Sequence, residues 1–153
     1  MSNTRRDSGF SLIEVLVSIA LMGVLMAIAV GGWSAWARAS EQSGTARELQ
    51  STLRQTQQRA VTEGTAMCVT FTSVAYTVSR GSCTSSPPPA ATRVEGPVPA
   101  GRGVQIASSA FPLGVTFTAR GTSTDGSVTV TRTDSSKVYT LQVEGFTGRV
   151  SLT

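Results

Sequence analysis

Residues 15–37 read VLVSIALMGVLMAIAVGGWSAWA, an uncharged and mostly apolar stretch near the amino terminus. A helix of this length spans roughly 34 Å, which is enough to cross a hydrocarbon core of about 30 Å. Arg5 and Arg6 precede the stretch, so the positive-inside tendency places the amino terminus in the cytoplasm and the chain from Arg38 onward outside. The stretch predicts a single membrane-spanning helix, with a helix buried in the core of a small domain as the alternative.

The composition excludes several classes of enzyme. The chain has 153 residues, with 13 Lys plus Arg, 9 Asp plus Glu, two Cys, no His and a net charge of +4. Without His, the chain cannot form serine–histidine triads, cysteine–histidine dyads or histidine-ligated zinc sites. Two Cys are too few for a four-thiolate metal site. We therefore expect no catalytic activity, no metal and no other cofactor.

Two kinds of processing fit the apolar stretch. The first is a secretory signal cleaved after Ala35-Trp36-Ala37, which would release a soluble protein beginning at Arg38, with a secreted enzyme as one alternative. However, the uncharged stretch is longer than the about 7–15 apolar residues that are usual in such a signal. Glu14 also lies at its start, where a secretory signal gains nothing from a carboxylate. The second kind of processing is suggested by residues 9–14.

Those residues read GFSLIE and follow a short leader with two Arg. The order of basic leader, Gly9, Phe10, Glu14 and a long apolar helix resembles the type IV prepilins and pseudopilins. The resemblance implies a leader of residues 1–9 that a prepilin peptidase removes between Gly9 and Phe10. It also implies methylation of the new amino group on Phe10.

Glu14 gains a physical role under this resemblance. An ionised carboxylate entering a membrane or a filament core costs at least about 2.5 kcal/mol unless it is paired. After cleavage, the nearest cation is the α-amine of Phe10, one helical turn away. The resemblance implies that the amine of a neighbouring subunit pairs with Glu14 during assembly and sets the axial register. The alternative is a Glu at the membrane edge with no partner.

The helix is predicted to continue to about Glu63, so that residues 10–37 form its membrane and filament-core half and residues 38–64 its amphipathic half. Ala46, Leu49, Leu53 and Ala60 recur at helical spacing among mostly polar residues. Gly64 then supplies a C-terminal cap.

Residues 65–153 are predicted to form a β-rich globular domain, because apolar and polar residues alternate there with a period of two. Together with the helix they predict an α+β fold of the type IV pilin-like kind, in which a long N-terminal helix packs on a C-terminal antiparallel β-sheet domain. The predicted strands cover residues 67–71, 74–78, 104–106, 115–119, 128–130, 139–143 and 150–152.

Residues 81–103 are predicted to be a loop, because they hold five of the six Pro. The run Pro87-Pro88-Pro89 favours an extended conformation. We interpret it as a stiff surface loop, with a ligand for an aromatic groove as the alternative.

Cys68 and Cys83 both lie outside the cell membrane in the predicted topology, where a pair of Cys favours a disulfide over free thiols. A disulfide that closes the loop between Cys68 and Cys83 would stabilise the domain by about 3 kcal/mol in the chain-entropy model.

Later segments deepen the resemblance. The helical ARELQSTLRQTQQRAVTEG of residues 46–64, which leads into a strand with a Cys, is similar to the GspH/FimT branch of this family. So are Tyr139-Thr140-Leu141 and Gly148-Arg149-Val150 near the end of the sequence.

The resemblance implies a minor pilin or pseudopilin, a structural subunit of a type II secretion pseudopilus or a type IV pilus that serves protein secretion or pilus biogenesis. Its partners would be other pilins or pseudopilins, a prepilin peptidase, an assembly platform protein and an ATPase. The chain would reside in the inner (cytoplasmic) membrane as a single-pass protein, with its C-terminal domain outside, and then in an envelope filament.

A DNA-binding minor pilin is the alternative function, since some relatives of the FimT type bind DNA through basic residues near the C-terminus. Basic residues in the predicted sheet region could contact phosphates, although Asp125, Asp134 and Glu144 are interleaved with them. The candidate contacts are Arg120, Arg132, Lys137 and Arg149.

Overall fold

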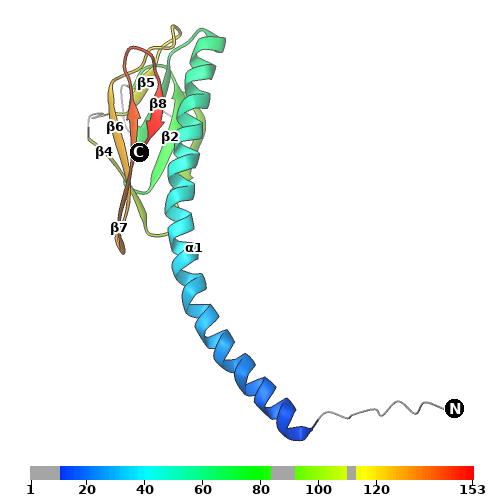
Figure 1. Cartoon of the computed structure of the whole chain (residues 1–153). Helices are drawn as coiled ribbons and strands as arrows, with labels where there is room; N and C mark the ends of the chain where they lie inside the picture. The colour runs from blue at the N-terminus through cyan, green and yellow to red at the C-terminus, as the bar shows by residue number, and fades with distance from the viewer. Residues whose placement is uncertain (1–10, 84–91, 110–112) are drawn as a thin grey trace, which may run out of the picture. The chain divides into compact units, whose positions relative to one another are not determined.

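The computed structural model describes residues 11–83, 92–109 and 113–153 (Figure 1). The chain divides into two compact units, Met1–Arg38 and Ala39–Thr153. Helix α1 (Leu12–Glu63) contributes its first part to one unit and its second part to the other. We describe the two units separately.

Both ends of α1 follow from local chemistry. At its start, the amides of Glu14 and Val15 donate to the carbonyl oxygen of Ser11, at 3.0 and 3.3 Å. At its end, Gly64 adopts a φ of +64°, the left-handed conformation that commonly terminates helices and that glycine adopts without steric cost. The prediction of one helix that ends at Glu63 is therefore confirmed.

Eight strands follow the helix, and they form two four-stranded antiparallel sheets. One has the order β3-β2-β1-β5 and the other the order β4-β6-β7-β8. Period-two alternation predicted seven of the eight strands, but not their division between two sheets. The strands are β1 (Met67–Phe71), β2 (Ala75–Arg80), β3 (Arg93–Pro99), β4 (Val104–Ser108), β5 (Val115–Phe117), β6 (Gly126–Arg132), β7 (Ser135–Val143) and β8 (Val150–Leu152).

Strand β3 corrects the prediction that residues 81–103 are a loop throughout. It lies at the edge of its sheet and pairs only with β2. A central strand must donate amide hydrogens to two neighbours, but an edge strand has only one, so Pro97 and Pro99, which have no amide hydrogen, are tolerated in β3. Gly96, at a φ of +98°, lets β3 approach β2 closely, since a Cβ there would lie 2.8 Å from the carbonyl oxygen of Tyr76. The run Pro87-Pro88-Pro89 lies outside the described residues.

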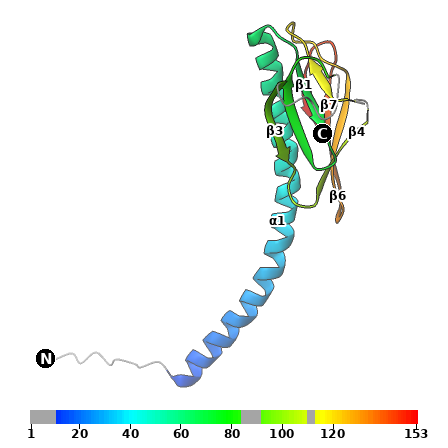
Figure 2. The ribbon, with the colours of Figure 1, turned by 180° about the vertical axis from the view of Figure 1, so that it is seen from behind.

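The hydrophobic core belongs to the unit Ala39–Thr153. Both views show the C-terminal part of α1 running along the strands (Figures 1 and 2). The predicted helical stripe of Ala46, Leu49, Leu53 and Ala60 is completely buried there. Inward-facing strand residues complete the core, and they include Met67, Val69, Tyr76, Val78, Val104, Ile106, Val115, Phe117, Val128, Val130, Leu141, Val143 and Val150.

Candidate assembly surface and the contacts of the globular unit

The first part of α1 exposes its apolar side chains. Leu12–Ala29 is long and apolar enough to cross a membrane, and none of this window is buried within the chain. Leu25 and Ile28, for example, are 67% and 70% exposed. Exposing this much apolar surface to water is unfavourable, so this part of the helix requires an apolar environment.

Glu14 lies in the first turn of this exposed helix. A negative charge is favourable at this position, where unpaired amides give the helix end a partial positive charge. Ser11 and Glu14 also match the S-x-x-E pattern of a capping box, a start signal that our sequence reading overlooked. One turn later, Ser18 Oγ donates to the Glu14 carbonyl oxygen at 2.8 Å. Gly9 and Phe10 lie outside the described residues, and the cleavage, methylation and pairing of Glu14 stay predictions.

Cys68 and Cys83 form the predicted disulfide, with their Cα atoms 5.1 Å apart. Cys68 lies in β1, which pairs with β2 on one side and with β5 on the other. The amide of Cys83 donates to Thr116 Oγ1 of β5 at 3.0 Å. The disulfide and this hydrogen bond therefore hold the segment that follows β2 against strands β1 and β5 of the first sheet.

Two glutamines fix α1 to the second sheet and its loops. Gln42 Nε2 donates to the carbonyl oxygen of Lys137 at 2.8 Å. Gln57 Nε2 donates to the carbonyl oxygens of Gly121 at 3.0 Å and Thr147 at 2.9 Å. The sequence does not predict these contacts, because a Gln on an amphipathic helix normally belongs to the solvent-exposed face.

A buried tyrosine links α1 to the first sheet. The hydroxyl of Tyr76, a residue only 2% exposed, lies 3.2 Å from Thr52 Oγ1 and donates to Glu48 Oε1 at 3.2 Å. Burial raises the pKa of Tyr76 above its ordinary value, and the negative charge of Glu48 raises it further, while the hydrogen bond with Thr52 opposes the shift. The neutral phenol is therefore the form that the folded domain favours.

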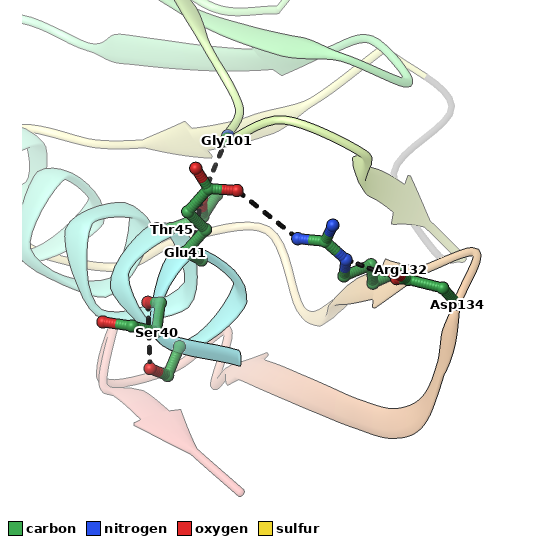
Figure 3. A network of polar contacts seen from close by, with 7 residues as sticks. Ser40, Glu41, Thr45, Gly101, Arg132 and Asp134 are labelled. Atoms are coloured by element: carbon green, nitrogen blue, oxygen red, sulfur yellow. Dashed lines mark hydrogen bonds and ion pairs between the residues drawn. The ribbon is translucent and has the colours of Figure 1, made fainter. Parts of the chain in front are cut away.

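Arg132 forms part of a polar network between α1 and the β6–β7 hairpin (Figure 3). Its guanidinium is paired with Asp134 and lies 3.4 Å from Glu41 Oε2, and its side chain is only 10% exposed. The hydrogen bond with Asp134 raises the pKa of Arg132, with Glu41 acting in the same direction. In the same network, Thr45 Oγ1 accepts from the Gly101 amide at 3.2 Å.

The four basic residues considered for DNA contact fall into two separate pairs and not into one cluster. Arg132 and Lys137 belong to the hairpin held near Gln42, whereas Arg120 and Arg149 flank the two loop carbonyls held by Gln57. Gln57 lies 15 residues further along the helix than Gln42, about 22 Å at 1.5 Å per residue. The arrangement does not support the DNA-binding alternative. Within the part of the chain that the structure describes, no group of three His, Cys, Asp or Glu could hold a metal ion.

Comparison with known families assigns the chain. The family described as type II transport protein GspH matches residues 45–147, which cover most of the globular unit and the helix that packs on it. The chain belongs to the GspH family. The prokaryotic N-terminal methylation motif matches residues 4–30 of this GspH-family protein, a range that includes part of the predicted leader and much of the apolar helix.

Solved structures show the same fold. The type IV minor pilin FimU of Pseudomonas aeruginosa matches with a TM-score of 0.58 and 20% identity, over 76% of this chain and 90% of FimU. The minor pseudopilin EpsH from the type 2 secretion system of Vibrio cholerae matches with a TM-score of 0.57 and 12% identity, over 74% of this chain and 96% of EpsH. No curated protein matches the sequence. The GspH-family chain thus has the fold of minor pilins and pseudopilins.

Proposed function

We propose that this GspH-family protein is a minor pseudopilin or minor pilin that works as a structural subunit of an envelope filament in protein secretion or pilus biogenesis. The observation that carries the proposal is the unburied apolar window Leu12–Ala29, which lies inside the match to the N-terminal methylation motif. The family description favours a type II secretion pseudopilus, and the similarity of fold to FimU leaves a type IV pilus as the second candidate.

In this proposal the apolar helix has two successive environments. It first spans the inner membrane, with the amino terminus in the cytoplasm and Ala39–Thr153 outside. It then moves into the filament core, where helices of other pilins replace the lipid. Processing by a prepilin peptidase, and assembly by a platform protein and an ATPase, complete the pathway.

Glu14 is the proposed assembly residue. A carboxylate in an apolar environment needs a partner, and a charge pair is stronger there than in water. The methylated amine of Phe10 on a neighbouring subunit would retain its positive charge and supply that partner. The pair would then favour one axial register over others.

The amino terminus of the mature protein tests the proposal directly. We expect mass spectrometry to find a peptide that begins at Phe10 with a methylated α-amine. Gly9→Val should leave the leader attached, because a bulky side chain obstructs entry of the extended peptide into the peptidase. A mature protein that begins at Arg38 would mean ordinary secretion and would refute the filament role.

Glu14→Val tests the assembly step separately. The variant keeps the helix apolar, so membrane levels and leader cleavage should stay near normal while its amount in sheared or purified filaments falls. Ser18→Ala, one turn later on the same helix, is the matched control, because it removes a hydroxyl and no charge. Normal incorporation of Glu14→Val would rule out the charge pair.

A further inference from the structure

Trp33 and Trp36 are the two tryptophans of the chain, and both lie on α1 within the unit Met1–Arg38. Because residues three apart on a helix lie on the same face, their rings pack together, with centroids 5.4 Å apart and an interplanar angle of 48°. The two residues are 70% and 63% exposed. The rings thus form one continuous aromatic surface that the described part of the chain leaves largely uncovered.

The pair lies where the apolar part of the helix ends. The window that is able to cross a membrane, Leu12–Ala29, ends four residues before Trp33. Arg38 is the first charged residue after Glu14, and it follows Trp36 by two residues. The rings therefore lie between the last apolar residues of the proposed membrane span and the first charge beyond it.

An indole ring suits a boundary between membrane and water better than either side of that boundary. The ring is large and apolar, so full exposure to water is unfavourable, whereas its N–H needs a hydrogen-bond acceptor that the hydrocarbon core lacks. The oxygens of the lipid headgroup region meet both requirements. A contact with the helices of other subunits is less suitable, because such contacts favour small residues that let the backbones approach closely.

The spacing between the pair and Glu14 matches the thickness of a bilayer. Trp33 and Trp36 follow Glu14 by 19 and 22 residues, which correspond to about 28 and 33 Å along the helix at 1.5 Å per residue. The hydrocarbon core is about 30 Å thick. With the rings at the outer boundary, the carboxylate of Glu14 thus lies at the cytoplasmic boundary, where it stays hydrated instead of entering the hydrocarbon.

We propose that Trp33 and Trp36 form an aromatic anchor in the headgroup region of the outer leaflet, and that this anchor fixes the depth of α1 so that Glu14 stays at the cytoplasmic boundary. The inference rests on the membrane-spanning step of the proposed function and names the lipid boundary as the surface that the rings contact. Without an anchor, the uncharged residues 15–37 would be longer than the hydrocarbon core is thick, and the helix would be free to tilt or to shift along its axis. The anchor favours one of these positions.

Tryptophan fluorescence of the full chain tests the position of the rings, because all of its tryptophan emission comes from this pair. The protein is reconstituted into vesicles of phosphatidylcholine and phosphatidylglycerol whose acyl chains carry bromine either near the carbonyl end or near the methyl end. We expect the larger loss of emission with bromine near the carbonyl end. A larger loss with bromine near the methyl end would place the rings in the hydrocarbon core and refute the anchor alone. If neither lipid quenches, the helix is not inserted, and the membrane-spanning step of the proposed function fails as well.

A second measurement tests whether the pair fixes the position of Glu14. The two cysteines of the chain are joined in a disulfide, so Ser18→Cys adds a single thiol for a fluorophore, one turn from Glu14. Trp33→Leu combined with Trp36→Leu should let this end of the helix sink into the hydrocarbon and push position 18 toward the cytoplasmic boundary. Iodide on both sides of the membrane should then quench the fluorophore more strongly.

The matched control is Trp33→Tyr combined with Trp36→Tyr, because tyrosine keeps an aromatic ring with a polar end. Its iodide quenching should equal that of the unaltered helix. Unchanged quenching in the double Leu variant, or the same increase in the double Tyr variant, overturns the proposal. If the double Leu variant leaves the depth of position 18 unchanged and lowers the amount of protein in purified filaments, the rings contact other subunits instead of lipid.

Discussion

Replacing Gly148 by Ala should measure how strongly the β7–β8 loop is locked to α1. Gly148 has a φ of +65°, and an added Cβ would overlap with Gln57 Nε2 and with the carbonyl oxygen of Gly121. The left-handed conformation costs a non-glycine residue roughly 1–2 kcal/mol. The overlap would also break the two hydrogen bonds of Gln57, each with a net value of about 0.5–1.5 kcal/mol. The free energy of unfolding should therefore fall by about 2–5 kcal/mol.

Gly64→Ala is the matched control, because Gly64 has a φ of +64° and open space around the position of an added Cβ. It should cost only the backbone contribution of roughly 1–2 kcal/mol. Urea denaturation of the fragment Ala39–Thr153, followed by circular dichroism, would compare the two variants. At about 4 °C per kcal/mol, Gly148→Ala should lower the melting temperature by about 8–20 °C. Equal losses in the two variants would refute the proposed contact between loop and helix.

Three further predictions concern the globular unit. The fragment Ala39–Thr153 should be soluble, folded and monomeric, because all the buried core residues lie within it; aggregation under oxidising conditions would contradict this. Reduction of Cys68–Cys83 should cost about 3 kcal/mol and lower the melting temperature of the fragment by roughly 10 °C; an unchanged melting curve would show that the ring adds no stability. Since the folded state raises the pKa of Tyr76, its contribution to stability is present below about pH 10 and is lost as the pH rises through the folded value. Tyr76→Phe should therefore remove part of the alkaline loss of unfolding free energy, whereas an identical pH dependence would argue against this assignment.

Sequence patterns that depend on near neighbours predicted their elements well. The end of α1 at Glu63 was predicted from Gly64, and the buried helical stripe from the spacing of Ala46, Leu49, Leu53 and Ala60. The seven strands predicted from alternation are all present, because one buried face is enough to impose a period of two.

Elements that depend on distant partners were harder to predict. The Pro-rich composition of residues 81–103 predicts a loop, but strand β3 forms within it because its position at a sheet edge makes Pro97 and Pro99 acceptable. The division into two sheets depends on which strands pair, and alternation carries no information about pairing. Sequence order also suggested grouping Arg120 with Arg132, although the fold places them near opposite ends of the packed part of α1.

The helix contacts made by Gln42, Arg54 and Gln57 share one property: each side chain donates to a backbone carbonyl oxygen of the second sheet or its loops. Every residue type offers that acceptor, so substitutions on the sheet side leave these attachments available as long as the backbone path is kept. Mutations can therefore accumulate in the strands and loops without detaching the helix. The fold that this chain shares with EpsH at 12% sequence identity shows how little sequence identity this architecture needs.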